Sequence, residues 1–513
     1  MYSSGTTKAQ YERLAATRYS YLDRGRDSSR LTIPTLLPDE GNNSATKFTT
    51  PYQSVGARGV NNLASALLLS LLPPNAPFFR LVLDEAEERK LEGIDPKIRS
   101  EVEDSLSQIE RSISKEIESS NMRVSLFEAL KHLIVTGNVL IYMPEDLPVR
   151  VCRLDRFVVK RCPQGYARCI ILKETIHPTM LPPAIREKVM AGMDASQENV
   201  EMYTKQEAID VDTVEVTQEV GGVPIPEVTQ QFKKTEAPFL ALRMIRVDGE
   251  DYGRGYVEQY YGDLSSLEGL TKAIVEGSAA AAKILFLVNP NGTTRARTLA
   301  ESPNGAIREG SANDVSVLQT QKAADFSIAF NALKQIEDRL SYAFLLTEST
   351  IRNADRVTAE EVRLVTQSIE KQLGGIYSVL SQDFQLPMLR RVMMQMSKSK
   401  KLPKLPTDMI SPAIITGVEA LGRGSDLNRL DLYLAGIAQM LGPQALQEYV
   451  NVPEYLSRRA ASLGIDRKGL VRTEEELAQQ RQQAMMAQMA QQAGPQMLAN
   501  SAAQTTTEEN TEQ

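Results

Sequence analysis

Few residues of this 513-residue chain have the types and spacing that catalysis or metal binding requires. Three cysteines, Cys152, Cys162 and Cys169, share one short segment, and their odd number and spacing fit neither a disulfide framework nor a zinc site. The two histidines, His132 and His177, lie far apart and belong to no HExxH-type motif. We interpret the cysteines as small buried strand residues and the histidines as core or surface residues.

Motifs for nucleotide and acyl chemistry are absent as well. The sequence contains no GxxxxGK[ST] phosphate loop, no GxSxG and no CxxC, so it shows no means of using ATP. Acidic residues such as Glu101, Asp104 and Glu110 recur at helical spacing opposite apolar stripes, which is typical of a solvated helix face rather than a two-metal nuclease site. We therefore expect a protein that is not an enzyme and has no cofactor or metal.

The charge balance limits how the chain could meet nucleic acid. With 58 Lys and Arg against 65 Asp and Glu, the net charge is −7. Tight phosphate binding needs clustered Lys and Arg, so this balance disfavours a protein that grips DNA. It is compatible with an acidic wall along which a duplex slides, with isolated cations making weak contacts. An ordinary soluble protein would have the same charge.

Helices and a small antiparallel sheet must position any site in the first half of the chain. We expect a helix over 10–24, a long amphipathic helix from about residue 95, a hairpin or small sheet over 149–175 and a second β-leaning stretch over 211–232. The longest apolar run, Leu63 to Leu72, is about half the length needed to cross a bilayer and predicts a buried helix. The fold class is therefore α+β and mainly helical, without a membrane span.

The second half is more regular. A helix is predicted over 256–283, and its small residues at 277–282 suit close packing against another helix, although they are also simply good helix formers. A β insert over 284–325 and a helix over 326–346 follow. The segment 347–357 is predicted to be a loop, and the capping box at 358–361 starts the best-patterned helix, which Pro387 kinks or ends. Residues 473–492 favour a helix, whereas 493–513 lack the apolar content to fold.

Nine stretches occur in an order that resembles a known family. They are residues 31–34, 55–65, 126–131, 136–140, 244–250, 252–254, 262–264, 287–290 and 356–361. This collinear series, within about residues 10 to 430, is similar to the portal, or head-to-tail connector, proteins of short-tailed, podovirus-like phages of the autographivirus group. Any single stretch would be weak evidence, but the ordered series is specific.

The resemblance implies a portal fold assembled as a dodecameric ring. By analogy, the wing comprises 1–255 and the helices of 358–430, the two stem helices are 256–283 and 326–346, the clip is 284–325, and the tunnel loop is 347–357. The crown is 431–492 and 493–513 is a disordered tail. The match weakens after about residue 430, which leaves the extent of the crown open.

The resemblance also implies functional residues and partners. Arg352, Asn353 and Arg356 of the tunnel loop would face double-stranded DNA without sequence preference, although Arg356 could instead pair with Asp355. Arg295, Arg297 and Arg308 of the clip would face the terminase first and the tail adaptor later. Other implied partners are capsid and scaffolding proteins. The N-terminus lacks a secretory pattern, so the expected location is the virion, at the capsid vertex, after synthesis in the host cytoplasm.

Two other classes of function remain open from the residues. One is a capsid-interior scaffolding or adaptor protein, which would bind partners through its helices and its Gln- and Met-rich end without enclosing DNA. A pore about as wide as a duplex would separate it from a portal. The other is a metal-dependent nuclease, for which the sequence offers no motif.

Overall fold

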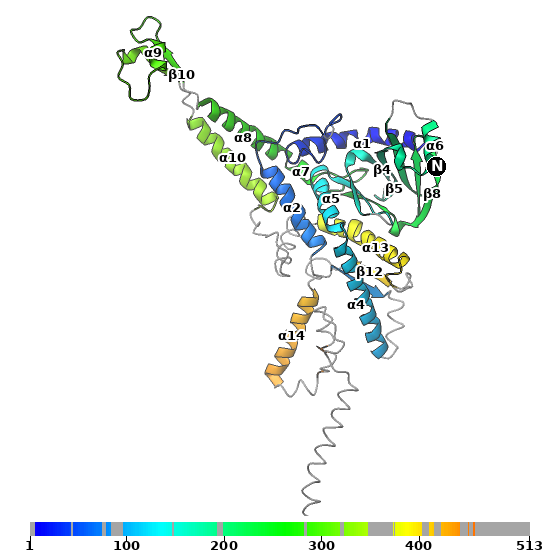
Figure 1. The fold of residues 1–513 in the computed structure, drawn as a ribbon. Helices are drawn as coiled ribbons and strands as arrows, with labels where there is room; N and C mark the ends of the chain where they lie inside the picture. Colours follow the sequence, from blue (N-terminus) through cyan, green and yellow to red (C-terminus); the bar gives the residue numbers. More distant parts are fainter. Residues whose placement is uncertain are drawn as a thin grey trace, which may run out of the picture. The chain divides into compact units, whose positions relative to one another are not determined.

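The computed structural model describes residues 6–42, 45–73, 78–83, 96–145, 148–191, 198–281, 285–318, 323–346, 373, 375–402, 410–414, 422–441, 450 and 455–456. The chain divides into two compact units, each considered by itself. The first comprises Met1–Gly93 and Ile109–Gly417, and the second comprises Ile94–Gln108 and Val418–Gln513. Figure 1 shows the described elements in sequence colours.

A five-stranded antiparallel sheet is the largest β element of the first unit (Figure 1). Its strands, in spatial order, are β4 (Phe157–Arg161), β5 (Ala167–Ile176), β6 (Val200–Ala208), β7 (Thr213–Val220) and β8 (Val223–Lys233). A second sheet has the order β3 (Arg150–Cys152), β2 (Asn138–Tyr142) and β9 (Phe239–Arg243). The expected hairpin over 149–175 is thus confirmed in β4 and β5, and the β-leaning stretch over 211–232 forms β7 and β8.

Both faces of the β4–β5 pair are buried, which explains their nearly continuous apolar sequence. Phe157 and Leu172 lie in one core cluster, together with residues of the second sheet. Val158 and Ile171 alternate with them and pack on the other face, against Tyr11 of helix α1 (Thr7–Arg30). Since side chains alternate along a strand, a strand covered on both sides must be apolar at consecutive positions.

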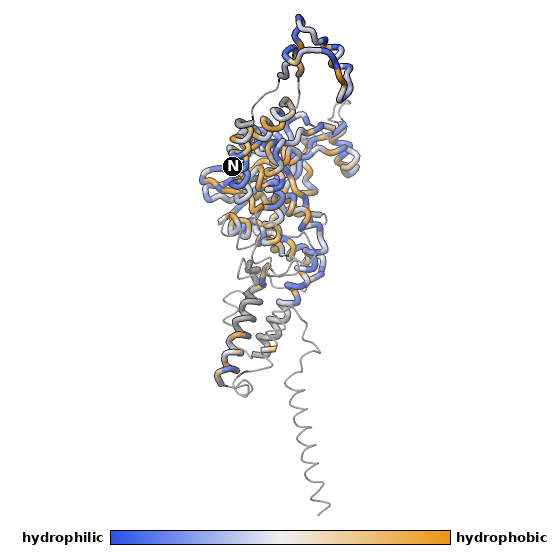
Figure 2. The backbone as a smooth tube through the Cα atoms, turned by 90° about the vertical axis from the view of Figure 1, so that its left-hand side faces the viewer, coloured by the Kyte–Doolittle hydropathy of each residue, from blue (hydrophilic) through white to orange (hydrophobic). Residues whose placement is uncertain are grey.

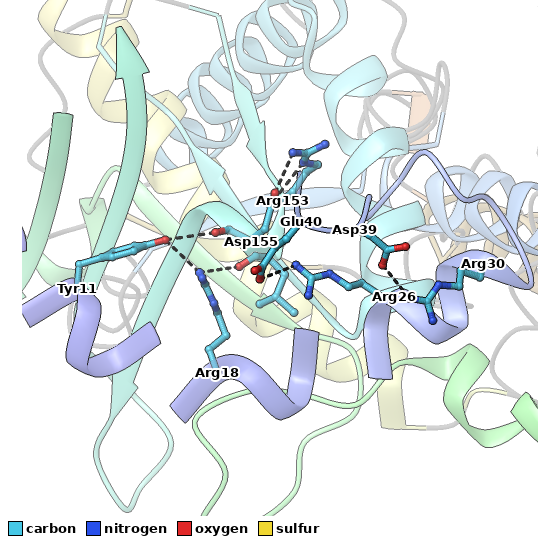
Figure 3. Close-up of polar contacts among 9 residues, drawn as sticks. Tyr11, Arg18, Arg26, Arg30, Asp39, Glu40, Arg153 and Asp155 are labelled. Carbon is cyan, nitrogen blue, oxygen red and sulfur yellow. Dashed lines mark hydrogen bonds and ion pairs between the residues drawn. The ribbon is translucent and has the colours of Figure 1, made fainter. Parts of the chain in front are cut away.

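Helix α1 is fastened to this sheet by an arginine that is only 5% exposed, Arg18 (Figure 3). Its guanidinium donates hydrogen bonds to the carbonyls of Leu154, at 2.9 Å, and Phe157. The Tyr11 hydroxyl donates to the carbonyl of Asp155 at 3.2 Å, two residues before Phe157. These contacts satisfy main-chain carbonyls at and just before the edge strand β4, and they hold α1 in place. The helix is longer than the predicted range of 10–24.

A helical layer completes the first unit. Its members are α2 (Val55–Leu71), α5 (Met122–Thr136), α12 (Gly375–Leu380), the π-type turn η6 (Ser381–Gln385) and α13 (Leu386–Lys398). Helix α2 is buried along most of its length, with Leu63 and Leu67 fully covered, as predicted for the apolar run. Among the residues described, no helix is long and apolar enough to span a membrane. The hydrophobic residues in Figure 2 gather in this sheet-and-helix body.

Pro387 does not end its helix. The backbone departs from α geometry just before it, in η6, and Pro387 lies in the first turn of α13. Proline has no N–H for the carbonyl four residues earlier, Asp383, so a locally widened turn accommodates it. Downstream, Arg391 is 1% exposed and donates to the carbonyls of Met143, at 3.1 Å, and Glu236, at 3.0 Å.

Two antiparallel helices follow β9. They are α8 (Tyr261–Ala281), preceded by the short α7 (Tyr256–Gln259), and α10 (Ala323–Ala343). Near one end of the pair, Gly277 lies so close to Phe326 that a Cβ on the glycine would meet the ring at 2.8 Å. Near the other end, Arg339 pairs with Asp263 at 2.8 Å. The small residues at the end of α8 therefore do allow close helix packing, within one chain.

The remaining elements are short or lie partly in the second unit. Between α8 and α10, β10 (Leu285–Val288) pairs with β11 (Val315–Leu318), and the segment also holds α9 (Ala296–Ala300) and the 3-10 turn η4 (Ala312–Asp314). Strand β1 (Phe79–Leu83) pairs with β12 (Ile410–Ile414). The other elements are helix α6 (Pro183–Ala191) and the 3-10 turns η1 (Leu154–Arg156), η2 (Pro178–Met180) and η3 (Lys234–Glu236). Helix α4 (Pro96–Ser119), expected from residue 95, belongs to both units, and α14 (Gly422–Leu441) belongs to the second.

Candidate channel-loop anchor and clip

The predicted loop residues Arg352, Asn353 and Arg356 lie outside the described residues, as does the capping box at 358–361. The structure instead describes the two points at which segment 347–372 begins and ends. Both points are attached to helix α2.

The end of α10 is the first anchor. The side-chain amide of Asn62, on α2, donates to the carbonyls of Phe344 and Leu345, each at 3.0 Å. Leu345 has a φ of 58°, a left-handed conformation that is unfavourable for leucine, and it is only 4% exposed. Such a conformation persists where its surroundings impose it, and here they include the Asn62 hydrogen bonds.

Close approach of the Phe344 side chain to the backbone of α2 completes this anchor. Gly59 of α2 faces Phe344, and a Cβ on the glycine would lie 2.6 Å from the Cγ of that ring. The Phe344 ring is fully buried against Tyr256, with centroids 5.7 Å apart. The Tyr256 hydroxyl donates to the carbonyl of Ala343 at 2.9 Å, and burial raises the pKa of Tyr256. The final turn of α10 is therefore held by α2 and α7 together.

The second anchor is formed by α12 and η6. The Tyr377 hydroxyl donates to the carbonyl of Ser70 at 3.1 Å, and the Gln385 amide donates to the carbonyl of Leu71 at 2.6 Å. These carbonyls belong to the last turn of α2, where backbone acceptors have no partner within the helix. Helix α2 thus fixes both ends of segment 347–372.

Helix α8 is linked to the start of α2 by a carboxylate. Glu268 accepts hydrogen bonds from the backbone amides of Tyr52, at 2.9 Å, and Gln53, at 3.1 Å. The Gln53 side chain donates to the carbonyl of Leu31 and accepts from the amide of Gly56. A negative charge close to the start of a helix is also favoured by the helix dipole.

Arg254 joins α7 to the loop before it. Its guanidinium donates to Glu250, at 2.6 Å, and to Glu258, at 3.0 Å. The hydrogen bond with Glu250, followed by that with Glu258, raises the pKa of Arg254. The contact stiffens the connection between the second sheet and α8.

In the β10–β11 insert, a carboxylate holds the fold of the turn. Asp314 accepts from the amide and hydroxyl of Thr293, at 2.7 and 3.0 Å, and from the amide of Thr294 at 3.0 Å. Hydrogen bonds from Thr294 and Thr293 lower the pKa of Asp314. The turn signal Asn291-Gly292 lies within this structure, since Gly292 donates its amide to the carbonyl of Asn289.

The three arginines of the predicted clip lie at different places in the β10–β11 insert. Arg295 precedes α9 as its N-cap, and Arg297 within α9 pairs with Glu301 at 2.9 Å. Arg308 lies in the following loop and donates to the Ser302 hydroxyl at 3.1 Å. All three side chains are exposed.

No metal centre is found within the described ranges. They contain no group of three His, Cys, Asp or Glu residues that could hold a metal ion. Cys152 and Cys169 are buried strand residues, as predicted, and burial raises the pKa of their thiols to about 11 and about 12. The prediction is wrong for Cys162, which is half-buried and lies in the turn just after β4. Burial likewise lowers the pKa of His132 to about 4, so this core histidine is neutral at pH 7.

The anchoring residues were not predicted from the sequence. A signal was nevertheless present, because Asn61 and Asn62 are polar residues in the middle of a mainly apolar helix. A buried or half-buried amide in such a setting needs hydrogen-bond partners. The partners could not be named, since Phe344 lies 282 residues further along the chain.

Comparison with known proteins identifies the family. Residues 4–471 match the model of the bacteriophage head to tail connecting protein. The portal protein of Escherichia phage T7 is 40% identical over 496 residues, covering 95% of this chain and 91% of the relative. That of Enterobacteria phage SP6 is 29% identical over 487 residues, covering 93% and 92%.

A solved structure, the neck of an empty gene transfer agent particle, covers 81% of this chain and 90% of its own at 11% identity. Its TM-score of 0.36 is too low to support an argument. The sequence relatives decide the matter without it: this chain belongs to the bacteriophage head-to-tail connecting proteins, a family of structural portal proteins that are not enzymes.

Proposed function

We propose that this chain is the portal subunit that forms a ring at the capsid vertex, through which double-stranded DNA is packaged and ejected. The observation that carries the proposal is its 40% identity to phage portal proteins over 95% of the chain. A virion location follows from the same relatives. The absence of an ATP-binding motif fits a passive conduit served by a separate motor.

A dodecameric ring would be built from the parts named above. Support comes from α8 and α10, an antiparallel pair that fits the role of a stem, and from the β10–β11 insert between them, which fits that of a clip. The proposed wing is the α+β body of 1–255 with the helices of 358–430, the crown is 431–492, and 493–513 is the tail. Twelvefold repetition would turn each single charge into a belt around the channel.

Arg352, Asn353 and Arg356 are proposed to meet the duplex in the channel. Support comes from the fixed ends of segment 347–372, because α2 holds both and would set where the loop stands in every subunit. Phosphate contacts of this kind carry no sequence preference and weaken as salt rises. Each contact would be weak, and the genome would be retained by the sum of the contacts from all subunits of the ring.

The clip is proposed to bind the terminase during packaging and the tail adaptor afterwards. Arg295, Arg297 and Arg308 are exposed there, and guanidinium groups suit carboxylates on a partner. Because the three charges are separate, single Ala substitutions should each weaken binding in part. Capsid and scaffolding proteins are the further expected partners.

Two experiments test the proposal. Electron microscopy of the purified protein should reveal closed rings with a lumen about as wide as a duplex, whereas an assembly without a lumen would favour a scaffolding or adaptor role. Replacing Arg352 and Arg356 together by Ala should leave rings intact but let packaged DNA leak. Unchanged DNA retention in assembled particles would reject the role of the loop.

A further inference from the structure

A cavity of about 450 Å³ lies at the C-terminal end of α13, among residues that belong to neither the predicted channel loop nor the predicted clip. Its walls come from the end of α4, the start of α5, the loop after β2 and the last turns of α13. All of these residues belong to the first compact unit. The volume is in the range of pockets that bind ligands or partner side chains.

The buried lining of the cavity is apolar. Its residues are Ile117, Met122, Val392 and Met396, each no more than 4% exposed. The side-chain amides beside them are already engaged, since Asn121 donates to the carbonyl of Val149 and Gln395 donates to that of Pro144. The interior therefore offers apolar contact rather than hydrogen bonds, and its two methionines can adjust to the shape of what enters.

The exposed lining carries opposite charges on two sides. Lys398 and Lys401, at the end of α13, pair with Glu145 at 2.5 Å and Glu116 at 2.7 Å, which come from the loop after β2 and from α4. Both lysine side chains are more than half exposed. Because exposed ion pairs contribute little to stability, an incoming group of matching charge can replace either partner.

The backbone at the end of α13 is strained at a third lysine. Lys400 has a φ of 57°, the left-handed conformation in which helices usually end with glycine. The amide of Lys401 donates to the carbonyl of Met396 at 2.9 Å and closes the helix. The helix dipole favours cations here, but it does not account for a lysine at a position that favours glycine. Strain of this kind is concentrated at functional sites, and it adds a third exposed cation to the α13 lysines, Lys398, Lys400 and Lys401.

We propose that this cavity binds an acidic peptide segment of a partner protein, which inserts one bulky apolar side chain against Met122 and Met396. Carboxylates of the segment pair with the α13 lysines, and its main-chain N–H groups donate to Glu116 and Glu145. A fatty acid would match the lysines and the apolar lining but has no donor for the two glutamates, so a peptide is the better match. The site uses neither the channel nor the ring and goes beyond the proposed portal function.

Selection from a random peptide display library tests the inference on the full-length protein. Peptides that bind the wild type are sequenced, and the affinity of each is measured by fluorescence anisotropy. We expect enriched peptides in which one Leu, Met or aromatic residue is flanked by Asp or Glu. Their affinity should fall as salt rises, because part of the attraction is between exposed charges.

Two variants locate the binding. Ser399→Trp places a large ring at an exposed residue of the lining and should fill the cavity, whereas Lys398→Gln with Lys401→Gln removes two cations. Each variant should weaken the binding of the selected peptides at least about tenfold. Lys160→Gln with Lys188→Gln is the matched control, because it removes the same charge from exposed residues outside the cavity, one of which, Lys160, also pairs with a carboxylate at 2.9 Å.

The inference is overturned if the selected peptides lack acidic residues or bind both cavity variants as tightly as the wild type. A selection that yields no peptide sensitive to either variant overturns it as well. If circular dichroism shows that Ser399→Trp does not fold, the lysine variant decides alone. None of these outcomes bears on the portal proposal, which is tested by ring formation.

Discussion

Gly59→Ala tests the anchor between α2 and α10 directly. An alanine Cβ would lie 2.6 Å from Cγ and 2.8 Å from Cβ of Phe344, well inside van der Waals contact. The Phe344 Cβ is bound to the backbone, and the ring is wedged against Tyr256 and Tyr260, so the last turn of α10 would have to move. Overpacking of this kind costs about 1–3 kcal/mol, and the gain in helix propensity from glycine to alanine offsets about 1 kcal/mol.

Because the 2.6 Å contact is a severe clash, we expect a cost in the upper part of that range, about 2–3 kcal/mol, and therefore a net loss of about 1–2 kcal/mol of local stability. Hydrogen exchange of the amides at 340–346 should accelerate by roughly a factor of 5 to 30. Gly269→Ala on α8 is the control, because no heavy atom lies within 4 Å of the added Cβ, and in unassembled protein it should stabilise the helix by about 1 kcal/mol. Equal shifts in the same direction for both variants would refute the reasoning.

Three further predictions follow from single contacts. Asn62→Ala should cost about 1–3 kcal/mol by removing two hydrogen bonds, and unchanged exchange at the end of α10 would contradict this. Arg391→Met should lower the urea midpoint by the equivalent of about 2–3 kcal/mol, because the buried carbonyl of Met143 and the half-buried carbonyl of Glu236 lose their donor, whereas Arg390→Met should have little effect. The folded-state pKa of His132, about 4, lies below its ordinary value of 6.5, so the unfolded chain takes up a proton at a higher pH than the folded chain. The free energy of unfolding of the wild type should therefore fall by about 3 kcal/mol as the pH is lowered from 6.5 to 4. In His132→Leu this part of the acid sensitivity should disappear, and an unchanged pH profile of the unfolding free energy would show that another group titrates.

Elements defined by local periodicity could be predicted from the sequence. Spacing or turn residues alone indicated the apolar run of α2, the helix predicted over 256–283, which the structure describes as α7 and α8, and the β insert after it. The alternation of apolar and polar residues was a weaker signal in strands that are buried on one face only or lie at the edge of a sheet. Strand β8 contains Pro224 and Pro226 at a sheet edge, where proline is tolerated, and this explains the patchy alternation of that stretch.

Contacts between distant segments could not be predicted. Asn62 meets Phe344 across 282 residues and Gln385 meets Leu71 across 314, and no local pattern encodes such partners. The contacts of Arg18 could not be predicted either, because this buried arginine donates to main-chain carbonyls and does not form an ion pair. The clip arginines were placed correctly in a β insert, but their separation into different elements required coordinates. Arg352, Asn353 and Arg356 remain predictions, because they lie outside the described residues.

Electron microscopy of the purified full-length oligomer tests the central claim most directly. A portal predicts closed rings whose central channel admits a DNA duplex. A protein that stays monomeric alone and in the presence of its capsid partners would contradict the account.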